Sequence, residues 1–315
     1  MKKSWQNDKL LEKISLKRVV LFNLYISLST IFFGIISLIP ILFLRLQTTA
    51  KLYWAGLLVL FSIFFILSPA ALIILVSVLL SVEVFFLLET RKFSLFLNIF
   101  ISSLVATIFL YSSFFLFKDY EFFIKLLEQV EEFRQKFLKH ITPKELVQLL
   151  SQLPSLIIIS FSFLLFFSLR LISFFKSSYT DAMAKKLSLN IFSTKSYLMQ
   201  LKKRSFNFST PSWVVWIFIL SLILAFVDTT LPIVFKTLGI NVLNICFSFY
   251  FLQGLGIVTD VLMLLKAKKI TKNLIYILSF IYLFSFISVL GFLDYWFNFR
   301  KKIKIYKMIN KNTPS

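Results

Sequence analysis

The side chains best suited to chemistry lie in the last two long apolar stretches of the chain, between residues 241 and 300. An amide or carboxylate in a membrane-length apolar segment is costly, by ~2.5–3.5 kcal/mol for an Asp at a helix centre. Such groups are therefore expected to face protein or water, where they could line a pocket or an ion path. The residues concerned are Asn241, Asn244, Gln253, Asp260 and Asp294.

Helical spacing sorts the polar residues of the first stretch into two stripes. At 3.6 residues per turn, Gln253, Gly256 and Asp260 fall within about 60° of one another on a helix. The neighbouring stripe holds Asn241, Asn244 and Ser248.

Two interpretations of these stripes remain open. In the first, they line a polar pocket or ion path shared with the neighbouring helices. In the second, they form interhelical hydrogen bonds that only fix packing, worth roughly 0.6 kcal/mol each. Asp260 could instead form an ion pair at headgroup level with the basic loop at Lys266. Gly254 and Gly256 are expected to let another helix approach closely.

Other charged residues lie beside the last stretches or in other apolar segments. Asp294 and Arg300 are six residues apart. They could form a fixed charge pair, or Asp294 could lie at the membrane interface beside an Arg300 whose side chain reaches the surface. Glu83 and Asp228 also need partners, and Arg170 could serve either of them.

Other kinds of chemistry have little support. Cys246 and His140 are the only residues of their types, which excludes an intramolecular disulfide and argues against a zinc site. No phosphate-binding loop, dinucleotide motif, zinc-protease motif or nucleophile elbow is present. We therefore expect no catalytic residues, no metal, no cofactor and no enzymatic activity.

The elements that carry these residues must be membrane helices. The chain has 315 residues, of which 58% are hydrophobic, and several uncharged runs exceed the ~20 residues that cross a bilayer as a helix. Backbone groups in lipid must bond within their own segment, which favours helices. The sequence thus predicts an all-α, polytopic membrane protein with about eight transmembrane helices and one amphipathic interfacial helix.

The domain organisation follows from the alternation of apolar and basic segments. We expect a basic tail at 1–18, helices 1–4 within 19–117, an amphipathic helix and loop at 118–145, helices 5–8 within 146–300 with a basic loop at 176–206, and a basic tail at 301–315. The expected spans are 19–44, 52–67, 70–88, 93–117, 146–175, 212–235, 241–265 and 273–297.

Local signals set several of these boundaries. Ser68-Pro69 combines a favoured N-cap with a favoured first helical residue, and predicts a tight break between the second and third spans, which could also be a re-entrant pair. Thr210-Pro211 predicts the cap of span 6. Pro40 predicts a kink or an end of span 1, and Pro154 predicts a break within 146–175.

The connections are basic, and a net charge of +21 could suggest nucleic acid. Because the Lys and Arg lie between apolar runs, we expect contact with anionic lipid headgroups instead, and no nucleic acid. Within 118–139, Glu121 with Lys125 and Glu132 with Lys136 are spaced for helical ion pairs. Residues 142–145 have the pattern of a capping box. The eight-span arrangement places 19 Lys and Arg on one side and 16 on the other, so loop charge does not settle the orientation.

The C-terminal part resembles the YybS-like family of bacterial inner-membrane proteins, whose function is not established. The resemblance rests on Gln253-Gly254-Leu255, on Gly291 with Asp294 and Arg300, and on Pro211 and Trp213, and is clearest over 206–300. It implies about eight helices and a multi-pass location in the bacterial cytoplasmic membrane. The family is also similar to the small substrate-capturing subunits of vitamin importers, although span 1 offers only Thr30 and Gly34 at the helix-docking spacing.

Two functions are expected from these observations. The first is a substrate-binding or transport-related protein that binds a small molecule in a polar pocket among helices 6–8. The alternative is a structural or regulatory scaffold that docks a protein partner through the amphipathic helix and the basic loop.

Overall fold

A computed structural model describes residues 19–30, 34–48, 50–117, 132, 136, 150–174, 208–226 and 232–312. All the secondary structure in these ranges is helical. This agrees with the expected all-α class. The N-terminal tail 1–18, the capping box 142–145, His140, the basic loop 176–206, Asp228 and residues 313–315 lie outside the described residues.

The chain divides into two compact units, which we treat separately. Unit 1 comprises residues 1–141 and 160–202, and unit 2 comprises residues 142–159 and 203–315. The helix α8 (Leu153–Phe174) therefore contributes its first residues to unit 2 and the remainder to unit 1.

Four described helices are long and apolar enough to cross a membrane: Pro69–Thr90, Leu95–Ser113, Leu153–Leu171 and Ile233–Leu264. A fifth candidate is a bent pair, Ile270–Ile281 with Phe284–Phe297. Val19–Thr30, Gly34–Leu46, Ala50–Ile66 and Trp213–Phe226 are shorter apolar helices. The protein is thus a helical membrane protein with four to five candidate spans, and the count of eight stays a prediction.

The predicted first span is interrupted rather than continuous. Val19–Thr30 is followed by a short 3₁₀ turn, η1 (Gly34–Ser37), and by α2 (Leu38–Gln47). Gly34 has φ +54°, a left-handed conformation that glycine adopts without strain. Pro40 lies in the first turn of α2, where the missing N–H has no helical partner to lose, so the break comes before the proline and not after it.

The break at Ser68 matches the sequence signal. α3 (Ala50–Leu67) ends there, and α4 (Pro69–Thr90) begins with the proline. The Ser68 side chain accepts a hydrogen bond from the Ala71 N–H at 3.3 Å, as an N-cap residue should. α5 (Leu95–Phe117) follows after a turn at Arg91 and Lys92 and packs on α4 in unit 1.

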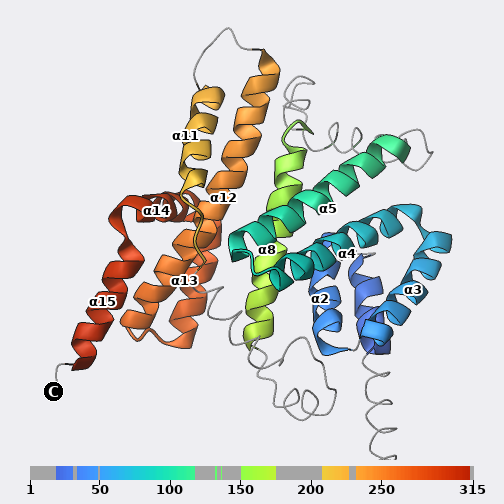
Figure 1. Ribbon diagram of the computed structural model, residues 1–315, viewed down its shortest axis with the longest axis horizontal. Coiled ribbons are helices and arrows are strands. Elements are labelled where there is room, and N and C mark those ends of the chain that lie inside the picture. Colours follow the sequence, from blue (N-terminus) through green and yellow to red (C-terminus); the bar gives the residue numbers. More distant parts are fainter. Residues whose placement is uncertain are drawn as a thin grey trace, which may run out of the picture. The chain divides into compact units, whose positions relative to one another are not determined.

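Unit 2 is built on one long helix, α12 (Ile233–Leu264), whose 32 residues extend about 48 Å. α11 (Trp213–Phe226) packs along one part of it, and α14 (Phe284–Phe297) crosses it (Figure 1). Between them an aromatic cluster fills the core: Phe292 contacts Tyr250 and Phe218 with ring centroids 5.3 and 4.8 Å apart.

The boundaries predicted for spans 6 and 7 were wrong. The helix expected to continue to Phe235 is described only as far as Phe226, and Pro232 precedes the first residue of a new helix, α12. Proline is favoured at helix starts, because its fixed φ suits the first turn and its missing N–H is not needed there. Span 7 therefore starts eight residues before Asn241, and the polar residues taken for its beginning lie inside the helix.

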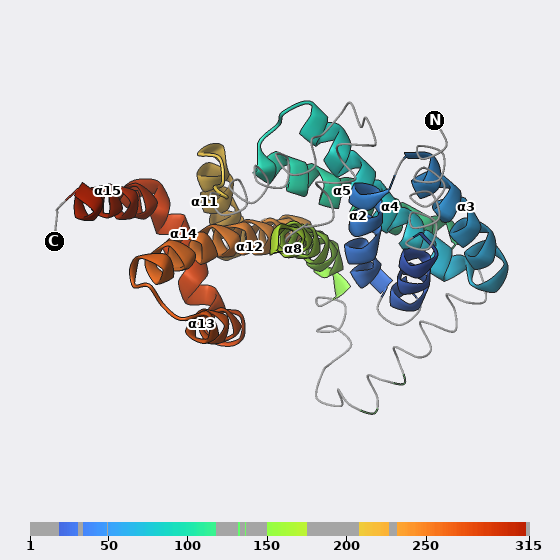
Figure 2. The same cartoon turned by 90° about the horizontal axis from the view of Figure 1, so that it is seen from below.

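The predicted last span is broken. α13 (Lys269–Ile281) and α14 meet at Tyr282 and Leu283 with a bend of 97° (Figure 2). α14 ends at Asn298, whose φ of 50° and ψ of 44° form a left-handed C-cap that Asn tolerates. The basic tail then continues as a helix, α15 (Phe299–Asn312).

Candidate functional site: a buried polar hub in unit 2

Four side chains from separate elements of unit 2 meet near the middle of α12. They come from the segment before α11, from α12, from α14 and from the first turn of α15. We call this group the polar hub: Thr210, Gln253, Asp294 and Arg300.

Gln253 is the acceptor and donor at the centre of the hub. Its Oε1 accepts hydrogen bonds from the backbone N–H of Thr210 at 2.9 Å and from the Thr210 hydroxyl at 2.6 Å. Its Nε2 donates to Oδ2 of Asp294 at 3.3 Å. The Thr210 hydroxyl thus binds Gln253 instead of capping span 6 as expected, and α11 begins three residues later.

Arg300 turns inward and is only 8% exposed. Its Nη1 donates to the Phe208 carbonyl and its Nη2 to the Gln253 carbonyl, both at 2.6 Å. Its backbone N–H donates to Oδ1 of Asp294 at 3.3 Å. Arg300 is therefore neither a surface-reaching side chain nor a direct side-chain partner of Asp294; it ties α15 to α12 and to the segment before α11.

Burial lowers the pKa of the Arg300 guanidinium, whereas the nearby carboxylates of Asp294 and Asp260 raise it. A buried cation is tolerated only where hydrogen bonds and opposite charges compensate for lost hydration. Two carbonyl oxygens and two carboxylates supply that compensation here.

Glycines allow the helices of the hub to approach so closely. A Cβ added to Gly254 would collide with the Ile287 carbonyl, and one added to Gly291 would collide with the Tyr250 carbonyl. At Gly256 a Cβ would occupy the place of the Arg300 guanidinium. Gly254 and Gly291 therefore allow α12 and α14 to cross in close contact, and Gly256 leaves space for the Arg300 guanidinium.

Asp260 lies one helical turn beyond Gly256. Its Oδ2 is buried and has no hydrogen-bond partner among the described residues, and the same holds for Nε of Arg300. Buried charged atoms without partners are rare in folded proteins and call for an explanation such as a bound water, ion or ligand. Asp260 thus carries an unused acceptor and Arg300 an unused donor.

The other predicted stripe behaves differently. Asn241 donates to the Ser151 carbonyl at 2.9 Å and accepts from the Ser155 N–H at 3.3 Å, so it caps the start of α8 within unit 2. This N–H has no acceptor within its own helix, because Pro154 places it in the first turn. Asn244 is half-buried and makes no hydrogen bond to the described residues. The structure therefore separates both from the hub.

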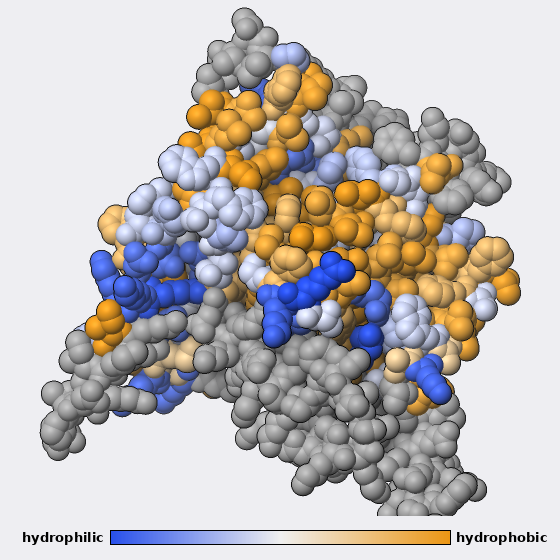
Figure 3. Space-filling view, viewed as in Figure 1, coloured by the Kyte–Doolittle hydropathy of each residue, from blue (hydrophilic) through white to orange (hydrophobic). Residues whose placement is uncertain are grey.

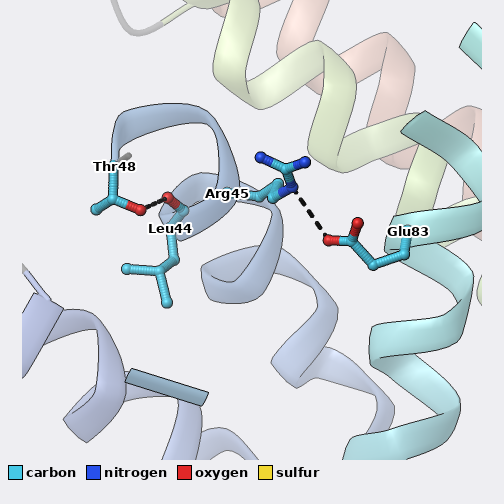
Figure 4. A network of polar contacts seen from close by, with 4 residues as sticks. All are labelled: Leu44, Arg45, Thr48 and Glu83. Atoms are coloured by element: carbon cyan, nitrogen blue, oxygen red, sulfur yellow. Dashed lines mark hydrogen bonds and ion pairs between the residues drawn. The ribbon is translucent and has the colours of Figure 1, made fainter. Parts of the chain in front are cut away.

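Unit 1 holds a different kind of charged contact (Figure 4). Nε of Arg45 lies 3.1 Å from Oε1 of Glu83, with side chains that are 29% and 27% exposed. The Arg45 guanidinium also lies 5.1 Å from the ring centroid of Tyr53. Glu83 thus pairs with Arg45 and not with Arg170, because the break at Gly34 brings α2 beside α4.

Arg170 and Glu89 are also buried in unit 1. The Arg170 guanidinium lies 5.0 Å from the Phe166 ring centroid. Oε2 of Glu89 accepts from Nδ2 of Asn98 at 2.6 Å. Among the described residues no group of three or more His, Cys, Asp or Glu could hold a metal ion.

Sequence reasoning found Gln253, Asp294 and Arg300 but missed the role of Thr210 and of the Phe208 carbonyl. It also missed Gly291 as the partner of Gly254. Thr210-Pro211 has the pattern of a helix cap, so the contact of Thr210 with Gln253 was not predicted. Gly254 and Gly291 could have been predicted as the residues at which two helices approach closely.

The long apolar helices and their buried polar contacts define a polytopic helical membrane protein. The chain belongs to the family described as "Predicted membrane protein (DUF2232)", which matches residues 18–295. This membership agrees with the resemblance to the YybS-like family. Comparison with curated proteins and comparison with solved structures each gave no match.

Proposed function

We propose that the protein is a membrane-embedded substrate-binding or transport-related protein whose ligand contacts the polar hub. The proposal is carried by one observation: Oδ2 of Asp260 and Nε of Arg300 are buried beside the hub without hydrogen-bond partners among the described residues. Charged groups in membrane proteins are costly and mark ligand or ion sites by default.

The chemistry of the hub sets the class of ligand. Arg300 offers a donor, whereas Asp260 offers an acceptor, and the hub has one cation and, with Asp260, two carboxylates. A small polar molecule with both a donor and an acceptor, or a cation, would complete these groups. Gln253 and Asp294 already bond to neighbours and would hold the geometry.

The variant Asp260→Asn tests this function with little risk to the fold, because this carboxylate makes no hydrogen bond that the change would break. Wild-type protein and variant would be solubilised gently and compared by native mass spectrometry. We expect a non-covalent small-molecule adduct on the wild type and its loss in Asp260→Asn. Glu83→Gln, the same change in unit 1, should retain the adduct.

Two results would contradict the proposal. One is an equal adduct on wild type and Asp260→Asn; the other is no small molecule on either protein. Either result would mean that the polar hub only holds the helices together and binds no ligand.

A protein-docking scaffold is the second candidate, favoured by one observation. Nζ of Lys136 lies 3.8 Å from Oε2 of Glu132, and both side chains are 70% exposed. This is the ion pair predicted for the amphipathic helix at 118–139, and it marks one charged, accessible helical face. Deleting 118–139 should then remove a co-purifying protein while the membrane helices stay intact; an unchanged set of co-purifying proteins would refute this role.

A further inference from the structure

Basic clusters flank the bent pair of helices α13 and α14 on both sides. No acidic residue lies between Asp260 and Asp294, and none follows Asp294. The first cluster is Lys266, Lys268, Lys269 and Lys272, and the second is Lys301, Lys302, Lys304, Lys307 and Lys311. A membrane span normally carries its excess of Lys and Arg on one side only, so a segment that crossed here would be unusual.

The geometry of the bent pair also argues against crossing. Its two helices have 13 and 14 residues and are each about 20 Å long. Neither reaches across a hydrocarbon core of ~30 Å. The 97° bend keeps them from adding their lengths in one direction.

The position of Arg300 gives a third argument. Its guanidinium is bonded to the Gln253 carbonyl, eleven residues before α12 ends at Leu264. The start of α15 and the end of α12 are therefore separated by about 17 Å along α12, roughly half of a bilayer core. This separation is too short to place the start of α15 and the end of α12 on opposite faces of a ~30 Å core.

The exposed side chains of α13 suit the apolar interior of the membrane, whereas those at the start of α15 suit its surface. α13 turns Tyr276 towards α12, where its hydroxyl donates to Thr259 at 2.9 Å. Its opposite face is apolar and points outward, with Ile270, Leu274 and Ile281 exposed by 82%, 56% and 64%. Hydrophilic residues gather over the start of α15, where Lys301 and Lys302 are exposed (Figure 3). The start of α15 therefore suits the headgroup region, whereas the outward apolar face of α13 suits the hydrocarbon next to it.

We propose that α13 and α14 enter the membrane and return, so that both lysine clusters lie on one membrane face and bind the headgroups of anionic phospholipids. A polybasic segment beside a membrane helix is attracted to an anionic leaflet. In the eight-span arrangement this return also moves Arg300 and the five Lys of the tail, and the division of Lys and Arg becomes 22 and 13, a clearer bias than 19 and 16.

The first test locates the two clusters. Cys246 is the only cysteine and is buried, so a Cys246→Ser background allows single labels at Thr271→Cys and Asn312→Cys, which leave every lysine in place. Sealed membrane vesicles of one orientation are treated with a membrane-impermeant maleimide, and permeabilised vesicles serve as the control. We expect both sites to react from the same side. Reaction from opposite sides would overturn the proposal.

The second test measures the lipid preference of the full-length protein. It is extracted from bilayers of phosphatidylglycerol and phosphatidylcholine, and bound lipids are counted by native mass spectrometry. In Lys301→Gln/Lys302→Gln/Lys304→Gln, we expect the enrichment of phosphatidylglycerol to fall by roughly fivefold per lysine. The triple Lys→Arg variant keeps the charge and should keep the enrichment.

The outcomes of this second test are decisive as well. If the enrichment of phosphatidylglycerol is unchanged in the Lys→Gln variant, the lysines do not bind anionic headgroups and the proposal is overturned. Neither test uses the ligand of the hub, so the proposal and the proposed function can fail independently.

Discussion

The charges of Arg45 in unit 1 and Arg300 in unit 2 are compensated in different ways. Arg45 makes a direct ion pair with Glu83 and stays partly exposed. Arg300 is almost fully buried, its guanidinium donates to two backbone carbonyls, and its backbone N–H donates to the Asp294 carboxylate. The first arrangement joins two helices, whereas the second joins three elements at one point.

The difference shows where each unit depends on its charge. A half-exposed ion pair contributes little, because water and salt screen it. Removing one member of a buried charged group leaves the others uncompensated, which costs much more. We therefore expect unit 2, and not unit 1, to depend on its arginine.

The largest effect is expected for Arg300→Met. The change leaves Asp294, Asp260 and two carbonyl oxygens without their cation and should lower the free energy of unfolding by about 3–5 kcal/mol. Thermal unfolding in mild detergent would measure it. Lys301→Met, the exposed neighbour, should change stability by less than about 0.5 kcal/mol. Equal effects of the two variants would refute the buried role of Arg300.

A smaller effect is expected where helices cross. Gly254→Ala and Gly291→Ala place a Cβ against the backbone carbonyls of Ile287 and Tyr250, and should each cost about 1–3 kcal/mol. Gly56→Ala in unit 1 meets only side-chain atoms of Asn23 and Val19, the nearest at 3.0 Å. It should be close to neutral, since Ala favours helix by about 1 kcal/mol over Gly. The comparison would fail if Gly56→Ala were the most destabilising of the three.

The smallest effect is expected for Arg45→Met. Loss of the contact to Glu83 should cost no more than about 1 kcal/mol, and added salt should reduce the difference from wild type. Chemical unfolding at two salt concentrations would measure this. A salt-independent loss of stability as large as that of Arg300→Met would show that both arginines stabilise their units to the same extent.

The sequence predicted features that depend on neighbouring residues. The capped break at Ser68-Pro69 and the pair of Glu132 with Lys136 follow from rules that act over three or four residues. The helical class followed from the length of the apolar runs, because lipid leaves few alternatives. The common face of Gln253 and Gly256 followed from helical periodicity.

Features that depend on contacts distant in the chain could not be predicted. Glu83 pairs with a residue 38 positions away, and Arg300 bonds to a carbonyl 92 positions away. The bend at Tyr282 and Leu283 has no glycine or proline to signal it. It occurs where α13 turns its polar side to α12 and α14 crosses that same helix at Gly254. Such a bend follows from contacts with α12, and the sequence of α13 and α14 alone does not indicate those contacts.

The stability of Asp260→Asn tests most directly whether Asp260, beside the polar hub, is a charge that the fold does not require. We expect a free energy of unfolding within about 1 kcal/mol of wild type, because relief of a buried carboxylate oxygen without a hydrogen-bond partner offsets the lost attraction to Arg300. A loss as large as that of Arg300→Met would make Asp260 a structural partner of the arginine and would contradict the claim.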